Sequence, residues 1–189
     1  YVVAALASIF YRFLWPSYFA LKMVPFTFSF LGLLFWHLAI SKYLSKKTAV
    51  YFSLLYIFAA SPFLQFTLAP IGDHAEIIFF QGLCLYLFCG FIAQEKNKMR
   101  NLFLFALISG FAMWFDYTHV SLLVGAFGYL ILYDRRQLSV RNLSYFTFGF
   151  LIGFSPWILL NLQGGGGLSI QVTPLWQLFT VELFLSRLF

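Results

Sequence analysis

Five ionisable side chains fall in two short polar connections between apolar runs of the sequence. Asp73, His74 and Glu76 belong to the first connection, and Asp116 and His119 belong to the second. Carboxylates and imidazoles can position a polar substrate or hold a divalent cation. Ionisable groups at the edge of long apolar segments are costly unless they are used or paired. Their grouping therefore predicts a polar site on one side of the protein.

The position of each acid decides how strongly the sequence favours function over simple solvation. Loop tips carry polar residues because water is there, and this explains Asp73 and His74 as well as a functional role does. Glu76 lies one step inside an apolar run, where solvation does not favour a carboxylate. Asp116 is similar, because aromatic residues flank it on both sides. A functional role is the better explanation for these two acids.

The composition identifies the elements that must position these side chains. Of 189 residues, 62% are hydrophobic, 23% are aromatic and only 10% are charged. A soluble domain needs more charged residues to cover its surface, and a disordered chain combines low hydrophobicity with high charge. The class that fits is an all-α, polytopic membrane protein. At ~20 residues for each membrane-spanning helix, plus loops, the chain has room for about six spans.

The apolar runs divide the chain into an interfacial helix, six membrane spans and a final segment. Residues 1–15 are too short for a comfortable span, so we expect an interfacial helix there. The expected spans are residues 19–41, 48–68, 76–93, 102–115, 120–133 and 143–161. Residues 164–189 begin with four glycines and are expected to form an outer-face loop and an apolar segment. Residues 1–189 are interpreted as one transmembrane domain.

Basic residues alternate between the connections and predict the orientation of the chain in a membrane. Nine of the 12 Lys and Arg residues lie in three connections, residues 42–47, 94–101 and 134–142. Cytoplasmic loops are enriched in Lys and Arg, so we expect these three loops inside and Glu76 and Asp116 outside. The net charge of +6 is then a topology signal, and no nucleic-acid partner is expected.

Several other features have structural explanations. Gly149 and Gly153 form a GxxxG pattern that is typical of helix packing. Cys84 and Cys89 lack the spacing of metal-binding or disulfide motifs. The glycosylation sequon at Asn142 falls in a loop assigned to the cytoplasm, so we discount it. Three polar residues within apolar runs are interpreted as hydrogen bonds between helices: His37, Gln65 and Gln81.

Charged and proline residues follow one another in a recognisable order. Lys22 and Pro25 stand at the start of a span, a basic loop follows, and the next span ends near Pro62. An acid, Glu76, then precedes the following span, with Asp73 close by. Later, a segment that begins with glycine runs to a polar residue, over residues 110–116, and the sequence GFLIGFSPW follows near the end.

This order resembles that of GT-C type membrane glycosyltransferases. Within them the chain is most similar to the dolichyl-phosphate-mannose protein mannosyltransferase-like group, which includes bacterial transferases that use polyprenyl-phosphate sugars. The resemblance implies that a lipid-linked sugar binds at the outer face and that the sugar moves, with inversion, to a lipid, glycan or protein acceptor. A carboxylate acts as general base on the acceptor hydroxyl, and the leaving phosphate needs positive charge or a metal.

The resemblance also implies roles for individual residues. The main catalytic Asp of the family lies in the first outer loop, which we expect upstream of Tyr1, so the chain is interpreted as a fragment. Glu76 and Asp73 are then supporting catalytic residues. The substrate-binding residues that it implies are His74, Asp116, His119, Lys22 and Arg12. Asp116 departs from the family, where many members have Lys or Arg, and an acid cannot hold a lipid phosphate. Whether a divalent cation takes part stays open.

Two other functions compete with sugar transfer. A transporter would line a substrate path with its polar loops, although transporters place polar groups near the middle of the membrane. A non-catalytic membrane subunit would tolerate substitution of every polar residue on the outer side. For Lys22 and Arg12, phosphate binding competes with simple extension of the side chains to the lipid headgroups. The sugar, the acceptor and the lipid carrier cannot be deduced from the sequence.

Overall fold

The computed structural model of the chain describes residues 2–14, 17–61, 63, 65, 75–94 and 96–162. Within these ranges the chain forms seven α-helices and two short 3-10 helices, and no β-strand. The α-helices are α1 (Val2–Leu14), α2 (Tyr18–Tyr43), α3 (Lys46–Ile57), α5 (Ala75–Ile92), α6 (Lys98–Phe115), α7 (Val120–Tyr133) and α8 (Val140–Leu162). The 3-10 helices are η1 (Tyr117–His119) and η2 (Arg135–Gln137). The predicted all-α class is confirmed for the described residues.

The chain divides into two compact units, residues 1–155 and 156–189. In the second unit the structure describes residues 156–162, which are the last turns of α8. All contacts reported below lie within the first unit.

Two helices of the described chain are long and apolar enough to cross a membrane. α2 has 26 residues and α5 has 18. At about 1.5 Å per residue they measure about 39 and about 27 Å, against a hydrocarbon core of about 30 Å. They match the expected spans at 19–41 and 76–93. Only 28% of the apolar window of α2 is buried, so most of its apolar surface faces outward.

The expected span at residues 48–68 is wrong as a single helix. α3 has 12 residues and ends at Ile57. It is therefore about 18 Å long, which is too short to cross a hydrocarbon core. Residues 58–60 are not helical. Pro62 explains the break, because in a continued helix its ring would clash with the carbonyl of Phe58, four residues earlier.

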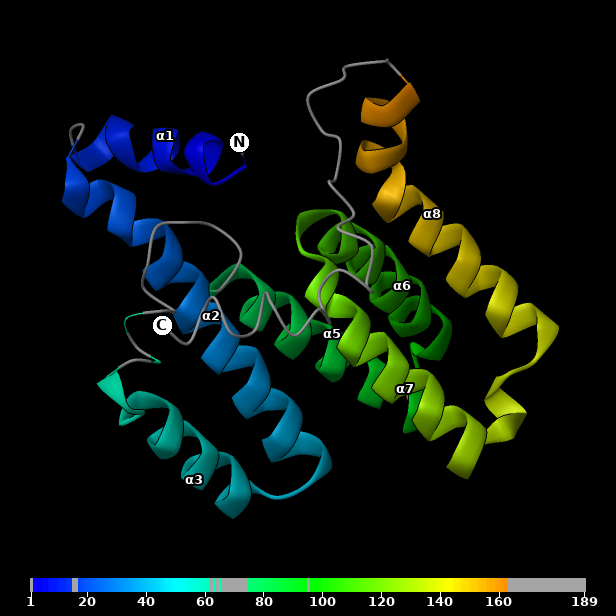
Figure 1. Cartoon of the computed structure of the whole chain (residues 1–189). Coiled ribbons are helices and arrows are strands. Elements are labelled where there is room, and N and C mark those ends of the chain that lie inside the picture. Colours follow the sequence, from blue (N-terminus) through cyan, green and yellow to red (C-terminus); the bar gives the residue numbers. More distant parts are fainter. Residues whose placement is uncertain are drawn as a thin grey trace, which may run out of the picture. The chain divides into compact units, whose positions relative to one another are not determined.

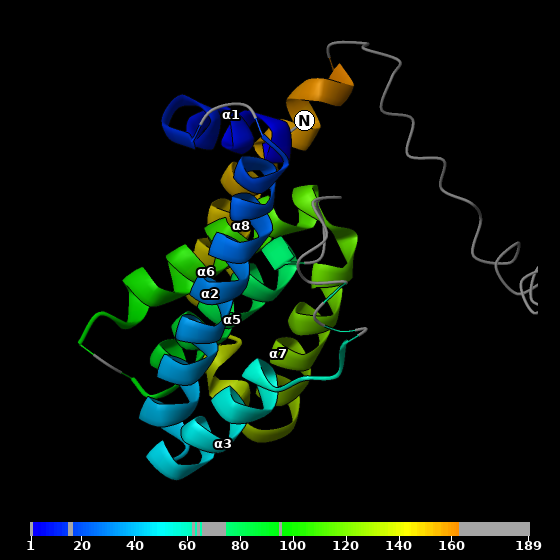
Figure 2. The ribbon, with the colours of Figure 1, turned by 90° about the vertical axis from the view of Figure 1, so that its left-hand side faces the viewer.

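Side-chain contacts fix the directions of the helices. α2 and α5 run parallel, whereas α3 runs antiparallel to α2, and α6 runs antiparallel to α5. The contacts that show this are Phe28–Phe79 and Tyr43–Tyr86 between α2 and α5, His37–Ser53 and Ser29–Tyr56 between α2 and α3, and Phe80–Phe115 and Phe88–Phe105 between α5 and α6. In Figures 1 and 2, α1 lies across the N-terminal end of α2, while α2, α5 and α7 run alongside one another.

One of the three interpreted interhelical hydrogen bonds is confirmed. His37 Nδ1 lies 2.8 Å from Ser53 Oγ, which joins α2 and α3. Gln65 Nε2 donates locally to Ser61 Oγ, four residues earlier, at 3.2 Å. The interhelical roles of Gln65 and Gln81 stay predictions.

Close packing of α8 on α6 depends on the GxxxG pair, as expected. A Cβ atom added to Gly149 would lie 2.9 Å from the carbonyl oxygen of Phe103, and one added to Gly153 would meet the carbonyl oxygen of Leu107. From α6, a Cβ at Gly110 would meet the backbone of α8. Only glycine allows the two backbones to approach this closely, which is the usual use of small residues between membrane helices.

These directions bring connections that are distant in the sequence to common ends. The connections at 42–47, 94–101 and 134–142 lie at one end, which we call the basic end. At the other end lie the start of α2, the start of α5 with Glu76, and residues 116–119. We call this the acidic end. The core between them is built from α5, α6 and α7: Cys84, Leu87, Phe88, Phe91, Leu102, Phe105, Ala126 and Leu130.

Candidate functional site at the acidic end

The structure brings Glu76, Asp116 and His119 to the same end of the helices. Glu76 lies in the first turn of α5, and the other two lie at and just after the end of α6. Because α5 and α6 are antiparallel neighbours, these ends meet, as expected from the alternation of basic loops. Asp73 and His74 lie outside the described residues, so their predicted roles are not tested.

Glu76 is a buried carboxylate. It is only 1% exposed, and its neighbours Ala75 and Ile77 are buried as well. α2 packs along the same end of α5, where Phe28 contacts Phe79 and Phe80. A negative charge in the first turn of a helix is favoured by the helix dipole. Burial of a carboxylate remains costly and is typical of a group that is used or paired.

Asp116 has a structural role that the sequence reasoning did not foresee. Its Oδ1 accepts a hydrogen bond from the backbone N–H of Thr118 at 2.8 Å. The side chain therefore caps η1 and turns the chain from α6 into α7. This local bond accounts for an acid at this position without a substrate, so of the two acids Glu76 is the stronger functional candidate.

His119 belongs to a buried chain of polar side chains that links three elements. Its Nε2 lies 3.3 Å from Ser109 Oγ of α6, and Ser109 Oγ lies 3.5 Å from Cys84 Sγ of α5. All three side chains are 0% exposed. His119 Nδ1 has no hydrogen-bond partner among the described residues.

Burial decides the charge of His119, which lies in the connection between α6 and α7. Desolvation lowers the pKa of His119 from 6.5 to about 4, although the nearby negative charge of Asp116 acts to raise it. The imidazole is therefore neutral near pH 7. It can hold Ser109 in place, and its low basicity makes it a poor proton acceptor at neutral pH.

The sequence reasoning missed Ser109 and dismissed Cys84. The spacing of the two residues about the α5–α6 connection could have indicated this pair. In two antiparallel neighbouring helices, residues equally far from the connection face each other. Cys84 and Ser109 are related in this way about the α5–α6 connection.

The described residues contain no complete set of side-chain ligands for a metal ion. Within them, His, Cys, Asp and Glu side chains nowhere gather in groups of three or more. A protein site for a cation usually needs at least three such ligands. A cation held by Glu76 would therefore need ligands from the segment that contains Asp73 and His74.

Lys22 and Arg12 lie near the corner where α1 meets α2, at the acidic end. Both side chains are exposed, and Lys22 Nζ lies 4.9 Å from the centre of the Tyr18 ring. Exposed aromatic side chains accompany them, including Phe13 and Phe19. Cations beside aromatic rings are typical of the headgroup region of a membrane. Phosphate binding and simple contact with headgroups both fit this arrangement.

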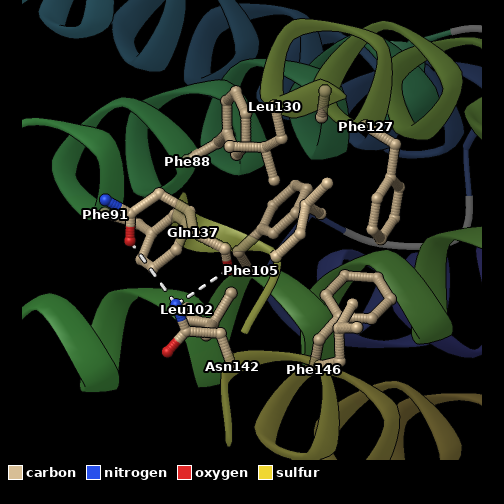
Figure 3. Close-up of a pocket in the computed structure, with 12 residues that line it drawn as sticks. Phe88, Phe91, Leu102, Phe105, Phe127, Leu130, Gln137, Asn142 and Phe146 are labelled. Carbon is tan, nitrogen blue, oxygen red and sulfur yellow. Dashed lines mark hydrogen bonds between the residues drawn. The ribbon is translucent and has the colours of Figure 1, made fainter. Parts of the chain in front are cut away.

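The enclosed pocket of Figure 3 lies at the basic end and is too small for a substrate. Aromatic and aliphatic side chains of α5, α6, α7 and α8 line a space of about 20 Å³, which is enough for one water molecule. At its rim, Asn142 Nδ2 donates to the carbonyl of Gln137 at 2.9 Å. Gln137 Oε1 accepts from Lys98 Nζ at 2.7 Å, and Gln137 Nε2 donates to Asp134 Oδ2 at 3.1 Å. Because Asn142 is buried and bonded in this way, it is a poor glycosylation acceptor.

Comparison of the chain with protein-family models, with curated proteins and with solved structures gave no match. Its function must therefore be argued from its own residues.

Proposed function

We propose that the chain is part of an integral membrane glycosyltransferase of the GT-C type. It would cross the membrane several times and move a sugar from a polyprenyl-phosphate donor to an acceptor at the outer face. The observation that carries the proposal is the separation of charge along the helices. Nine basic residues mark the basic end, and a buried carboxylate, Glu76, marks the acidic end.

The surface of the described helices supports a membrane setting. Large apolar side chains are widely exposed, such as Leu55 at 75% and Leu132 at 71%. Apolar surface of this extent is not stable in water and is expected to face lipid or another protein. Together with α2 and α5 and the alternating basic loops, it supports a multi-pass protein whose basic end is cytoplasmic.

The proposed chemistry assigns a role to each charged group. The acceptor oxygen bonds to the anomeric carbon while the bond from that carbon to the phosphate oxygen breaks, and the phosphate leaves with the electron pair. A carboxylate takes the acceptor proton. Within this chemistry Glu76 has a supporting role. Lys22 and Arg12, at the same end, are placed to attract the phosphate.

The order of residues that resembles this family supports sugar transfer over the alternatives. A transporter is the runner-up. The buried chain of Cys84, Ser109 and His119 supplies polar groups inside the helices, but all three are closed off from solvent, whereas a transport path must open to it. A non-catalytic subunit is distinguished by experiment, because it tolerates loss of the Glu76 charge.

The test is sugar transfer by membranes that contain the whole protein with Glu76→Gln. The substitution keeps the shape and one acceptor oxygen but removes the charge, so we expect a loss of about 10²–10⁴-fold in rate. Transfer from a radiolabelled polyprenyl-phosphate sugar is measured, and a blot checks the protein level. Asp134→Asn is the matched control at the basic end, and wild-type transfer is expected from it. Wild-type transfer by Glu76→Gln would contradict the proposed role.

A further inference from the structure

A groove of about 580 Å³ opens between α2, α5 and α7 towards the basic end. Tyr43 at the end of α2 and the following Leu44 line it, α5 contributes Cys89 and Ile92, and α7 contributes Gly125, among others. This volume is more than an order of magnitude larger than the enclosed pocket of about 20 Å³ near α8. The groove lies far from Glu76 along α5.

The groove owes its depth to a missing side chain on α7. A Cβ atom added to Gly125 would have no described atom outside its own helix within 4 Å. The glycine pair on α8 behaves in the opposite way, since Gly149 and Gly153 sit directly against the backbone of α6. Gly125 thus leaves a hollow that no neighbouring helix fills.

The chemistry of the lining favours a hydrocarbon chain as the occupant. Apolar side chains form most of the wall, and the polar atoms are limited to the Cys89 thiol and a few hydroxyl groups such as that of Ser121. A sugar or nucleotide would leave its own hydroxyl groups without partners here, which is costly. A hydrocarbon chain has no such groups and fits this wall without that cost.

Charge at the mouth of the groove favours an anionic headgroup on that chain. Lys42 is the residue before Tyr43, and its side chain is exposed. Its Nζ lies 5.0 Å from the centre of the Tyr43 ring and 3.4 Å from Tyr86 Oη. The basic end also carries Lys46 and Lys47 on the same connection. Basic clusters of this kind attract anionic lipids.

We propose that this groove binds one hydrocarbon chain of an anionic membrane phospholipid, with the headgroup next to Lys42. The proposal needs the membrane setting of the proposed function but not sugar transfer, so either can fail without the other.

The test uses the whole protein in vesicles of phosphatidylcholine and phosphatidylglycerol, one of which carries a photoactivatable group on an acyl chain. After irradiation, the labelled peptides are identified by mass spectrometry. We expect phosphatidylglycerol to label the α5 and α7 residues of the groove several-fold more than phosphatidylcholine does. Equal labelling by the two lipids, or labelling spread evenly over all helices, would overturn the proposal.

Two glycine variants form a matched pair for this experiment. Gly125→Leu places a side chain in the groove, whereas Gly128→Leu adds the same side chain to α7 at a position that also faces open space but does not line the groove. We expect Gly125→Leu to lose most of the groove labelling and Gly128→Leu to keep it. Wild-type labelling in Gly125→Leu would contradict the proposal.

A measurement on the unmodified chain guards against misfolding of the variants. Cys89 lines the groove, whereas Cys84 is buried in the core. The rate at which a lipid-soluble maleimide modifies Cys89 should fall several-fold as the fraction of phosphatidylglycerol rises. A constant rate would refute the proposal, as would a disulfide or cross-link from Cys89 to a second copy of the chain, because a protein would then occupy the groove.

Discussion

At the basic end, Gln137 bonds to Asp134, Asn142 and Lys98, and three of these four residues lie within nine positions of one another along the chain. At the acidic end, the buried His119 bonds to Ser109 on another helix, and Glu76 is buried at the start of a third. Most of the bonds at the basic end join residues of a single connection, although Asn142 Oδ1 is buried with no hydrogen-bond partner among the described residues. The acidic end distributes its ionisable groups over several helices.

The difference separates a structural role from a functional one. A buried polar network whose members bond to one another stabilises a connection and needs no ligand. A buried ionisable group costs free energy unless it is used or paired, and such groups cluster at functional sites. We infer that the bonded side chains at the basic end hold the helices in place, and that this arrangement positions Glu76 at the acidic end.

The largest expected effect is a loss of stability when the packing of α8 on α6 is disturbed. Gly153→Leu places a side chain against the carbonyl of Leu107 on α6, where the backbone cannot move aside. We expect a loss of about 3 kcal/mol or more of stability, at the upper end of the range for overpacked cores. The melting temperature of the purified protein in detergent measures it.

Gly128→Leu is the matched control for this prediction, since a Cβ there meets no described atom outside its own helix within 4 Å. Its stability should stay within about 0.5 kcal/mol of wild type. If Gly153→Leu were as stable as Gly128→Leu, α8 would not pack on α6 as described.

A smaller effect should appear at the acidic end alone, as a dependence of stability on pH. The pKa of His119 in the folded protein is about 4, below the ordinary 6.5. The unfolded chain therefore binds a proton first as the pH falls. The stabilisation from neutral His119 is fully present above pH 6.5 and is lost as the pH drops from 6.5 towards 4, by at most about 3 kcal/mol.

His119→Gln sharpens this prediction, because glutamine can still bond to Ser109 but does not titrate. Melting temperatures are compared between pH 7 and pH 4 for both proteins. We expect wild type to lose several degrees more than His119→Gln over this interval. Equal losses would show that His119 is not held neutral by burial.

Much of the fold was predictable from the sequence because apolar length and basic loops are local signals. They predicted α2 and α5 nearly to the residue, and they placed Glu76 and Asp116 at one end. The break after α3 was missed, because hydrophobicity continues through residues 58–68 although the helix ends at Ile57. Hydrophobicity reports whether a segment can be buried in lipid and does not report whether its helix is continuous.

The site was predictable only in part, because contacts between helices decide it. The sequence indicated that Glu76 was unusual, yet it could not show that Asp116 caps η1 or that Ser109 meets His119. Glycine pairs illustrate the same limit. Gly149 and Gly153 pack closely on α6, while Gly125 and Gly128 on α7 face open space. Whether a glycine serves helix packing is decided by the element opposite it, which the residue type alone does not show.

Labelling of single cysteines at the two ends tests the central claim most directly. Cys84 and Cys89 are replaced first, and Lys46→Cys at the basic end and Thr118→Cys at the acidic end are then introduced separately. Intact cells are treated with a membrane-impermeant thiol reagent. The account predicts labelling at position 118 from outside, and at position 46 only after the membrane is permeabilised. Labelling at position 46 in intact cells, with none at position 118, would contradict the orientation and the proposed outer-face site.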